Sequence, residues 1–183
     1  MVVVSLIQET SVTIEALYAL SNAAYKMWSD QGLDEPWMHR SIGEFREALS
    51  DAMVFVALDA GSHELLGMHC FRGNLHKKRA RGLYLAVSPK AFNQGVATQL
   101  LAYASEYLLH AGFTHLIGST ATGASWSVRW HLKVGYRLIG FRRAKSGCLD
   151  SYVFRKQLLR HPLYSSRLFC RCLFCYRRIM AAL

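Results

Sequence analysis

The sequence predicts one mixed α/β domain followed by a short basic tail, and three observations support this prediction. Segments of β-branched or alternating apolar residues and segments with helical apolar spacing follow in the order β, α, α, β, β, β, α, β, α, β, β. Strand pairs in the middle and at the end of this series indicate a sheet that is mostly antiparallel. No internal repeat and no low-complexity linker precedes residue 160, so we expect the elements to form one domain.

The first three elements are a strand and two helices. Val2–Ile7 is rich in β-branched residues and bounded by polar ones, which is typical of a buried strand. Ser11 is positioned to cap a helix in which apolar residues recur at helical spacing over residues 14–28. A glycine and a proline within residues 29–37 end that helix. A second, shorter helix is expected at about residues 42–52.

Three strands and a helix come next. Residues 53–60 and 64–71 form a predicted hairpin across Gly-Ser-His. Gly82–Val87 is a third strand, which Pro89 ends because proline has no N–H for a ladder. A helix is expected from about Thr98 to His110. The remaining elements are expected as a strand at 114–120, a helix at 125–134 and a closing antiparallel pair at 136–141 and 151–158.

The composition is that of a globular domain with a sizeable core, since 52% of the 183 residues are hydrophobic and 19% are charged. The amino terminus has no basic segment before its short apolar run, and no window of about 18 apolar residues occurs. Neither a signal peptide nor a membrane span is therefore expected. The five cysteines do not form the pattern of a secreted disulfide framework. We expect reduced thiols and a cytoplasmic location.

The positive charge is concentrated at the C-terminal end. The net charge is +10, and residues 155–183 carry seven basic side chains and no acidic ones, so residues 1–154 carry the remaining 15 basic and all 12 acidic side chains. This predicts a domain at 1–158 and a basic, cysteine-rich tail at 159–183. Nucleic acid is not an expected partner, because the charge lies in a tail without an RNA-binding motif.

The tail contains the pattern Cys-x-Cys-x-x-Cys and leaves three alternatives open. Its thiolates could bind a metal, but the usual second half of a zinc site is missing, so no metal is expected. It could be a basic amphipathic segment that contacts a membrane surface peripherally. It could also be a terminal helix that packs or frays.

The stretch Ser88–Leu101, SPKAFNQGVATQLL, places a glycine and a small residue between a strand and a helix. The first-turn N–H groups of a helix have no partner within it, and the helix dipole adds partial positive charge there. Gly95 lets a phosphate approach the backbone without a Cβ in the way, and Ala97 keeps a nearby position small. Neither a Walker loop nor a complete dinucleotide fingerprint is present. The stretch therefore predicts a phosphate site made of backbone amides.

Two motifs in the right order resemble those of the GCN5-related N-acetyltransferase (GNAT) family. The first is Leu85–Thr98, in which Gly95 and Ala97 match the family pattern Arg/Gln-x-x-Gly-x-Gly/Ala. The second is Trp130–Tyr136, which matches the end of a segment of the type Phe-Tyr-x-Lys-x-Gly-Phe. The resemblance covers about residues 2–158. It implies a mixed, mostly antiparallel central sheet with splayed strands, flanked by helices.

The resemblance also implies a site for acetyl-CoA. The strand before the loop is expected to offer backbone groups to the pantetheine arm at Leu85, Ala86 and Val87. The loop is expected to bind the pyrophosphate through Asn93, Gln94, Gly95, Val96, Ala97 and Thr98. In the family this strand carries a bulge and diverges from the next strand, which opens a wedge where thioester and amine meet. An N–H near Val87 is then expected to stabilise the oxyanion of the tetrahedral intermediate.

The sequence departs from the family pattern at three positions. Phe92 replaces the Arg or Gln of the first motif, so phosphate binding must rest on backbone amides and on Lys90. Ala124 stands where an Asn often contacts the cofactor. His131 stands where a Tyr commonly protonates the departing thiolate. His131 is either a proton donor or shuttle, or a histidine packed between helix and sheet.

The general base has several candidates, because the strand Gly82–Val87 contains no carboxylate. They are His69 on the predicted hairpin, Tyr84, and a water held by Ser119. Tyr152 is a further candidate proton donor or a core residue. The loop after the first helix contains Asp34 and Glu35, which either face an acceptor amine or are solvated. Trp28 and Trp37 flank this loop and either line the acceptor pocket or pack under the loop.

The predicted function is acetyl-CoA-dependent N-acetylation of a primary amine by direct transfer in a ternary complex. A covalent acetyl carrier is not expected, because no cysteine lies in the two motifs. Acetyl-CoA is the expected co-substrate, and the acceptor is the amine of a small molecule or of a protein. The alternative is a catalytically degenerate member that binds acyl-CoA as a sensor or scaffold, which the three departures favour. The sequence determines neither the acceptor nor the oligomeric state.

Overall fold

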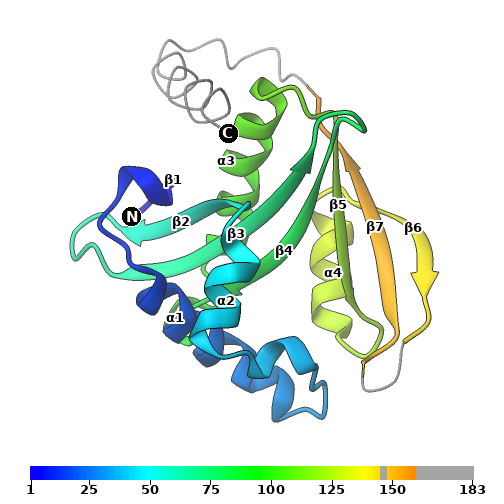
Figure 1. Cartoon of the computed structure of the whole chain (residues 1–183), viewed down its shortest axis with the longest axis horizontal. Helices are drawn as coiled ribbons and strands as arrows, with labels where there is room; N and C mark the ends of the chain where they lie inside the picture. The colour runs from blue at the N-terminus through cyan, green and yellow to red at the C-terminus, as the bar shows by residue number, and fades with distance from the viewer. Residues whose placement is uncertain (145–147, 160–183) are drawn as a thin grey trace.

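A sheet of seven strands, in the order β1-β2-β3-β4-β5-β7-β6, runs through the residues that the structure describes (Figure 1). The computed structural model describes residues 1–144 and 148–159. Neighbouring strands are antiparallel except β4 and β5, which are parallel. The strands are β1 Val2–Leu6, β2 Met53–Asp59, β3 Leu65–Asn74, β4 Arg79–Val87, β5 His115–Ala121, β6 Arg137–Arg142 and β7 Ser151–Gln157. The predicted mixed, mostly antiparallel sheet is confirmed.

Helices lie on both faces of the sheet. α1 (Ile14–Ser29) and α2 (Ile42–Leu49) cover β2 to β4 on the face toward the viewer of Figure 1, and α3 (Val96–His110) and α4 (Ser125–Lys133) lie on the other face. Short 3₁₀ segments follow or precede them: η1 Ile7–Glu9, η2 Pro36–His39 and η3 Pro89–Ala91. The predicted tail lies outside the described residues from residue 160 onward, and so do the three alternatives for its cysteines.

The predicted order of elements is confirmed, with differences at helix starts. Thr13 caps the first helix, because its hydroxyl accepts a hydrogen bond from the Ala16 N–H at 3.3 Å. The expected cap, Ser11, lies two residues too early. α3 begins at Val96, two residues before the expected start, because the left-handed backbone of Gly95 (φ 80°) turns the chain directly before it.

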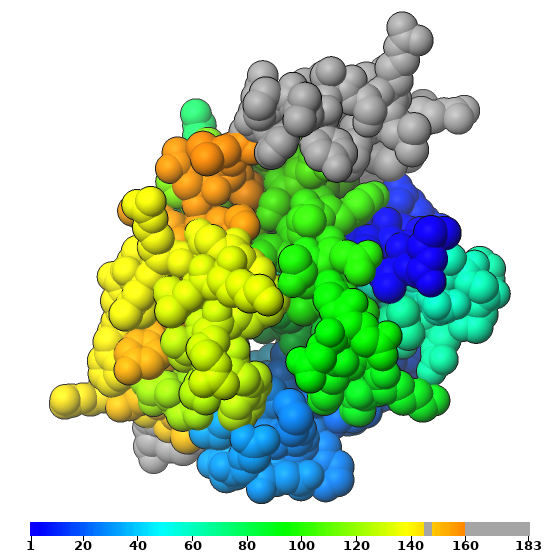
Figure 2. Space-filling view, turned by 180° about the vertical axis from the view of Figure 1, so that it is seen from behind, coloured from blue at the N-terminus to red at the C-terminus, as the bar shows by residue number. Residues whose placement is uncertain are grey.

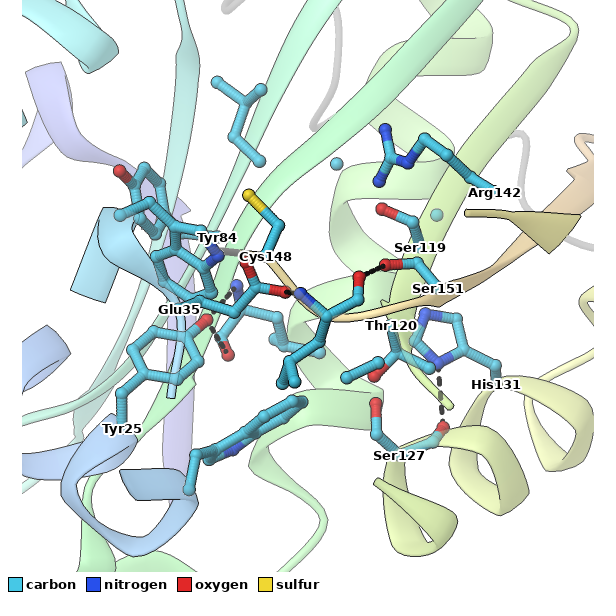
Figure 3. Close-up of a pocket in the computed structure, with 18 of the residues that line it drawn as sticks. Tyr25, Glu35, Tyr84, Ser119, Thr120, Ser127, His131, Arg142, Cys148 and Ser151 are labelled. Atoms are coloured by element: carbon cyan, nitrogen blue, oxygen red, sulfur yellow. Dashed lines mark hydrogen bonds between the residues drawn. The ribbon is translucent and has the colours of Figure 1, made fainter. Parts of the chain in front are cut away.

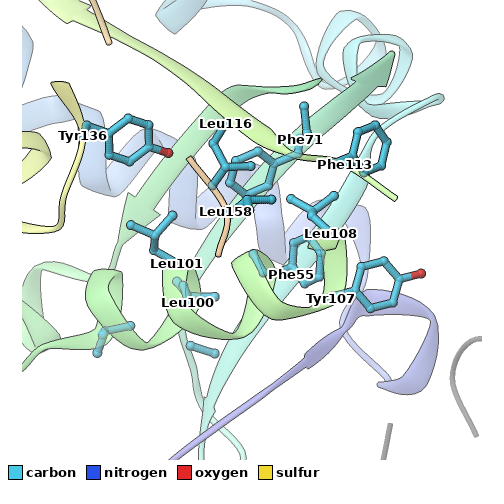
Figure 4. Packing of buried hydrophobic residues seen from close by; sticks show 14 of the residues in the cluster. Phe55, Phe71, Leu100, Leu101, Tyr107, Leu108, Phe113, Leu116, Tyr136 and Leu158 are labelled. Atoms are coloured by element: carbon cyan, nitrogen blue, oxygen red, sulfur yellow. The ribbon is translucent and has the colours of Figure 1, made fainter. Parts of the chain in front are cut away.

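The larger apolar cluster lies between the sheet and α3 (Figure 4). Its largest fully buried members include Phe55, Phe71, Leu100, Leu116 and Phe154. Burial of a side chain of this size contributes roughly 1.5–3 kcal/mol. The cluster therefore holds α3, and the loop at its N-terminus, firmly against β1, β2, β3 and β4.

β4 contains a bulge at Leu83. One step along β3, from Cys70 to Phe71, corresponds to two steps along β4, from Tyr84 to Gly82, so Leu83 has no partner of its own. Before the bulge, Ala80 faces the cluster under α3. After the bulge, Tyr84 and Ala86 face a second apolar cluster, which lies under α1 and α2 and includes Leu17 and Phe45. The bulge therefore exchanges the two faces of the strand halfway along it.

β4 and β5 pair at one end only. Arg79–Arg81 pair with His115–Ile117, whereas the rest of β4 pairs with β3 and the rest of β5 with β7 in the described part of the chain. The two strands therefore diverge (Figure 1), which confirms the predicted splayed sheet. The backbone N–H and C=O groups along the open edge of β4 need partners other than β5.

Candidate functional site

A cavity of about 470 Å³ fills the space between the diverging strands. Side chains from α1, β3, β4, β5, α4 and the β6–β7 loop point into it (Figure 3). On the opposite side of the molecule, Figure 2 shows a hollow where α3, α4 and the loop after α1 meet. The lining residues come from both faces of the sheet, so the cavity passes between the strands from one face to the other. Its volume lies in the range of small-ligand sites.

The N-terminus of α3 offers a group of unpaired backbone amides. Asn93 and Gly95 both have positive φ, 61° and 80°, which arranges successive N–H groups as in an anion-binding nest. Within the described residues, no hydrogen bond takes up the N–H groups of Asn93, Gly95, Val96 or Ala97. The space over Gly95 is open, because a Cβ there would have only the Gln99 Nε2 atom within 4 Å, at 3.9 Å. This arrangement suits a phosphate.

The other two residues predicted for the phosphate loop already have partners. The Gln94 N–H donates to the Ala91 carbonyl at 3.4 Å, and the Thr98 N–H donates to the Gly95 carbonyl at 3.0 Å. The Thr98 hydroxyl accepts a hydrogen bond from the Trp130 indole Nε1 at 3.4 Å. Because Trp130 lines the cavity, this contact joins α3 to α4 beside it.

The hydroxyl of Tyr25 occupies part of the open edge of β4. It donates to the Leu85 carbonyl at 2.9 Å and accepts from the Leu85 N–H at 3.2 Å. Since strand groups alternate in direction, those of Ala86 point toward its partner Met68 in β3. Of the three β4 residues predicted to bind pantetheine, Val87 is therefore the one whose N–H and C=O face the open edge without a partner among the described residues.

Burial keeps the Tyr25 phenol protonated, because it raises the pKa of that group well above its usual value. The neutral hydroxyl can then act as donor and acceptor at the same time. Its bond to Leu85 thus closes one part of the open edge in the absence of any ligand.

His131 on α4 is both packed and directed at the cavity. Its ring stacks on Phe154 with 4.8 Å between ring centroids, and Nδ1 lies 2.8 Å from the Ser127 carbonyl oxygen (Figure 3). A carbonyl oxygen only accepts, so Nδ1 carries the proton and Nε2 of the neutral ring is an acceptor. Burial lowers the pKa of His131, which keeps the ring neutral near pH 7. Nε2 lies over the β5 backbone, 3.0 Å from where a Cβ on Gly118 would be.

His69 and Tyr84 line the cavity from β3 and β4. Burial lowers the pKa of His69 to about 3, so its ring is neutral and weakly basic, and its Nδ1 atom has no partner within the described residues. The ring lies against Phe71, with 4.1 Å between centroids. The Tyr84 hydroxyl accepts a hydrogen bond from Arg40 Nη1 at 2.8 Å. His69 and Tyr84 are therefore both at the cavity, as predicted, and burial weakens His69 as a base.

β5 brings two hydroxyl side chains to the cavity from opposite faces. Ser119 is half-buried and also lines a second hollow beside α2. Thr120 lies on the other face, and its buried Oγ1 atom has no partner in the part of the chain that the structure describes. Tyr152 of β7 pairs with Thr120 of β5. It packs against Phe154 and does not line the cavity.

The segment between α1 and α2 closes one end of the cavity. The Glu35 carboxylate accepts a hydrogen bond from the Leu149 N–H of the β6–β7 loop at 3.1 Å. Trp28 contacts Trp126, the second residue of α4, with 5.4 Å between ring centroids. Trp28, Glu35 and Trp37 all line the cavity. Aromatic faces beside a carboxylate suit a protonated amine.

Asp34 does not share this position with Glu35. It is exposed and accepts hydrogen bonds from the Ser29 hydroxyl and from His39 Nε2, both at 2.7 Å. The hydrogen bond from His39 holds the pKa of Asp34 below its usual value. The two acids predicted as a pair therefore act separately, and Asp34 braces the loop from outside.

Several cavity residues had no recognisable signal in the sequence. Tyr25 belongs to the apolar stripe of the first helix, and its partner lies 60 positions away. Thr120 follows an ordinary strand pattern. Cys148, whose thiol is exposed, lies outside both motifs and lines the cavity from the β6–β7 loop. Local sequence patterns do not report contacts of this kind.

Residues 1–144 and 148–159 contain no group of three or more His, Cys, Asp or Glu side chains arranged to hold a metal ion. Over the same residues, no helix combines the length and the apolar character needed to cross a membrane.

Tyr25→Phe is expected to lower the free energy of unfolding by about 1–3 kcal/mol, because it removes the partner of the Leu85 N–H and C=O in a buried position. Urea unfolding followed by circular dichroism measures this change. Tyr18→Phe is the matched control, since it removes one hydrogen bond, to the Arg40 carbonyl, and should cost about 1 kcal/mol. A smaller loss in Tyr25→Phe than in the control would contradict the role given to Tyr25.

Comparisons with known proteins agree with this geometry. A family profile described as Acetyltransferase (GNAT) family matches residues 14–136. The ribosomal-protein-S18-alanine N-acetyltransferase of Escherichia coli is similar in structure, with a TM-score of 0.69 and 16% identity over 91% of this chain and 99% of that one. No curated protein matches the sequence significantly.

Two similar structures contain coenzyme A or acetyl-CoA. The PaiA N-acetyltransferase of Thermoplasma acidophilum, in complex with coenzyme A, has a TM-score of 0.65 and 15% identity over 86% of this chain and 99% of that one. A GNAT family acetyltransferase of Elizabethkingia anophelis with acetyl-CoA bound has a TM-score of 0.64 and 16% identity over 86% and 98%. With the profile covering most of the domain, the chain belongs to the GNAT family of acetyltransferases.

Proposed function

We propose that this acetyltransferase moves an acetyl group from acetyl-CoA to a primary amine by direct transfer in one ternary complex. The observation that carries the proposal is the open edge of β4, which lies between the free amides of α3 and a cavity lined from both faces of the sheet. A donor and an acceptor can enter such a cavity from opposite sides and meet between the strands. Holding both reactants together supplies much of the rate enhancement expected of such an enzyme.

The donor side has the features that acetyl-CoA requires. The free amides of Asn93, Gly95, Val96 and Ala97 suit the pyrophosphate. The C=O of Val87 suits an amide N–H of an extended arm, in the manner of an added strand. Acetyl-CoA supplies a thioester, and the Val87 N–H is placed to donate to its carbonyl oxygen as negative charge develops there. The bound CoA of the two relatives named above supports the same ligand class.

The acceptor side has the features that an amine requires. Trp28, Trp37 and Glu35 provide aromatic faces and one carboxylate. A protonated amine first releases one proton to solvent, because only the neutral nitrogen is a nucleophile. As the neutral nitrogen forms its bond to the acyl carbon and the C–S bond breaks, a second proton must leave it. The unprotonated Nε2 of His131 can accept that proton and release it toward the departing thiolate. With a model thiol pKa of about 8.5, the thiolate leaves without strong acid assistance.

The acceptor is a small-molecule amine or a protein amine. The E. coli relative is named for a protein acceptor, and nourseothricin acetyltransferase, similar over 60% of this chain with a TM-score of 0.54, is named for a small molecule. Chemistry at the cavity is compatible with both. The alternative function, an acyl-CoA sensor that transfers nothing, predicts acetyl-CoA binding without CoA release for any amine in a broad panel. A cytoplasmic location remains a prediction.

Gly95→Val is expected to weaken acetyl-CoA binding at least tenfold, because a branched Cβ covers the amides and disfavours the left-handed backbone. Isothermal titration calorimetry measures the affinity. Gly112→Val is the matched control, since Gly112 also has positive φ (93°) and open space around it but lies at the other end of α3. Equal affinities in the two folded variants would remove the phosphate site from this loop.

His131→Phe is expected to lower the turnover number for CoA release by about 10²-fold and to leave acetyl-CoA affinity nearly unchanged, because it removes the proton acceptor and keeps an aromatic ring on Phe154. A thiol-detecting assay gives the rate, and thermal unfolding shows whether the variant is folded. Turnover within about threefold of the parent would assign His131 to packing alone.

Cys148→Ser is expected to retain full turnover, because direct transfer uses no covalent carrier. Cys148 is the test position, since its thiol is exposed at the cavity, whereas burial raises the pKa of the Cys70 thiol and keeps it unreactive. Intact-protein mass spectrometry after incubation with acetyl-CoA alone should show no acetyl adduct. An adduct that disappears in Cys148→Ser, together with lost turnover, would replace direct transfer by a two-step route.

A further inference from the structure

A row of arginines crosses the sheet beside the cavity. Arg81 of β4 pairs with Ile117 of β5, Ile117 pairs with Arg155 of β7, and Arg155 pairs with Arg137 of β6. Residues paired across neighbouring strands place their side chains on the same face. Arg81, Arg155 and Arg137 therefore lie on one line across four strands, which we call the arginine row.

Arg155 and Arg137 lie on a part of the sheet that no described helix covers, and Arg81 lies at its border, where it lines a hollow beside α2. Arg155 alternates along β7 with Phe154, which is buried in the α3 cluster, so Arg155 and the row point to the face of α1 and α2. Those helices lie over β2 to β4 and leave β5, β7 and β6 open (Figure 1). All three arginines of the row are exposed.

The arginines of the row have no acidic partner. None of the ion pairs or side-chain hydrogen bonds within residues 1–144 and 148–159 includes Arg81, Arg137 or Arg155. Three carboxylates line the hollow that Arg81 also lines: Asp51 pairs with Arg72 at 2.6 Å, Glu44 accepts hydrogen bonds from Ser41, and Glu47 forms no ion pair or hydrogen bond with Arg81. Every acidic side chain of the chain lies before residue 155, so the tail supplies none.

Two further positive charges, those of Arg142 and Arg79, lie close to Arg81. Partial desolvation, followed by these two charges, lowers the pKa of Arg81, although the group stays protonated at neutral pH. Guanidinium groups that repel one another without a counter-charge form a natural site for carboxylates, which they bind in bidentate fashion.

We propose that the arginine row binds acidic side chains of a peptide acceptor whose amine enters the cavity. This inference rests on the N-acetyltransferase function proposed above. Ser119, which lines the cavity, lies two residues from Ile117 on the same face of β5, about 7 Å along the strand. Arg142 lines the cavity itself. Positive charge therefore extends from the cavity onto the open face of the sheet.

The length of the row favours a peptide over a small acid. Arg81 and Arg137 are three strand spacings apart, about 14 Å, which an extended peptide of about four residues spans. A single carboxylate would engage one or two of the guanidinium groups. A nucleic acid matches the charge, but it offers no aliphatic primary amine to a thioester. An acidic peptide provides both the charge and the amine.

The double variant Arg137→Gln/Arg155→Gln tests the proposal, because it removes two charges from the row and keeps extended polar side chains. The matched control is Lys26→Gln/Arg46→Gln, which removes two charges from exposed helix positions paired with Asp30 and Glu15. The probes are labelled synthetic peptides with a free amino terminus followed by glutamates, serines or lysines. Fluorescence anisotropy gives their affinity, and CoA release gives KM and turnover number.

The row variant should bind the glutamate peptide about tenfold more weakly and raise its KM similarly, with turnover number and acetyl-CoA affinity unchanged, since each exposed ion pair contributes up to about fivefold. The serine peptide should be unaffected, and the control should stay within about twofold. Salt at about 0.5 M should reduce the preference for the glutamate peptide.

Equal affinity for the three peptides, or equal losses in the two double variants, would overturn the role of the row. Tighter binding of a single-stranded oligonucleotide than of the glutamate peptide would overturn it in favour of nucleic acid. If no peptide leads to CoA release but the row variant still binds the glutamate peptide more weakly in the anisotropy measurement, the peptide-binding role of the row is supported and the proposed acetyl transfer is wrong. If only serine or lysine peptides release CoA, the transfer stands and the row has no part in it.

Discussion

The separation of β4 from β5 is the constraint on which the rest of the site depends. A strand that leaves its neighbour exposes backbone N–H and C=O groups that must find other partners, because an unpaired buried group costs roughly as much as a lost hydrogen bond. β4 resolves this in two ways. The Tyr25 hydroxyl takes both groups of Leu85, and Val87 stays open beside the cavity and α3. The edge that we propose binds the ligand is thus a place where the fold leaves its hydrogen bonding incomplete.

The bulge at Leu83 gives the same strand two different surfaces. Before the bulge, Arg81 faces the open side of the sheet and Ala80 the α3 cluster. After it, Tyr84 and Ala86 pack under α1 and α2. Without the extra residue, the alternation of side chains would turn Leu85 and Val87, instead of Tyr84 and Ala86, toward α1 and α2. The bulge therefore decides which side chains of β4 lie on the face of α1 and α2 beyond Leu83.

Burial sets the chemistry of the two histidines at the cavity. His69 and His131 are both almost fully enclosed, and both stay neutral because charging a buried imidazole is unfavourable. The bond from Nδ1 to the Ser127 carbonyl makes His131 an acceptor at Nε2. A position where relatives commonly have a proton donor is thus occupied here by a group suited to receive a proton. The packing that holds the ring in place also decides which way a proton can move.

The sequence by itself determined the order of the elements, the central hairpin and the family, because periodicity, turn residues and contiguous motifs express these features locally. It also indicated the splayed strands and the residues around Gly95 through the family resemblance. Only the tertiary structure decided which backbone groups of β4 stay free, since Tyr25 and Leu85 are 60 positions apart. Only the tertiary structure showed that Asp34 and Glu35 have different surroundings, because Glu35 accepts a hydrogen bond from Leu149, which lies 114 positions away. The arginine row likewise depends on strand register and on the position of β7 between β5 and β6. Long-range pairing aligns Arg81, Arg155 and Arg137, and no local pattern of residues encodes it.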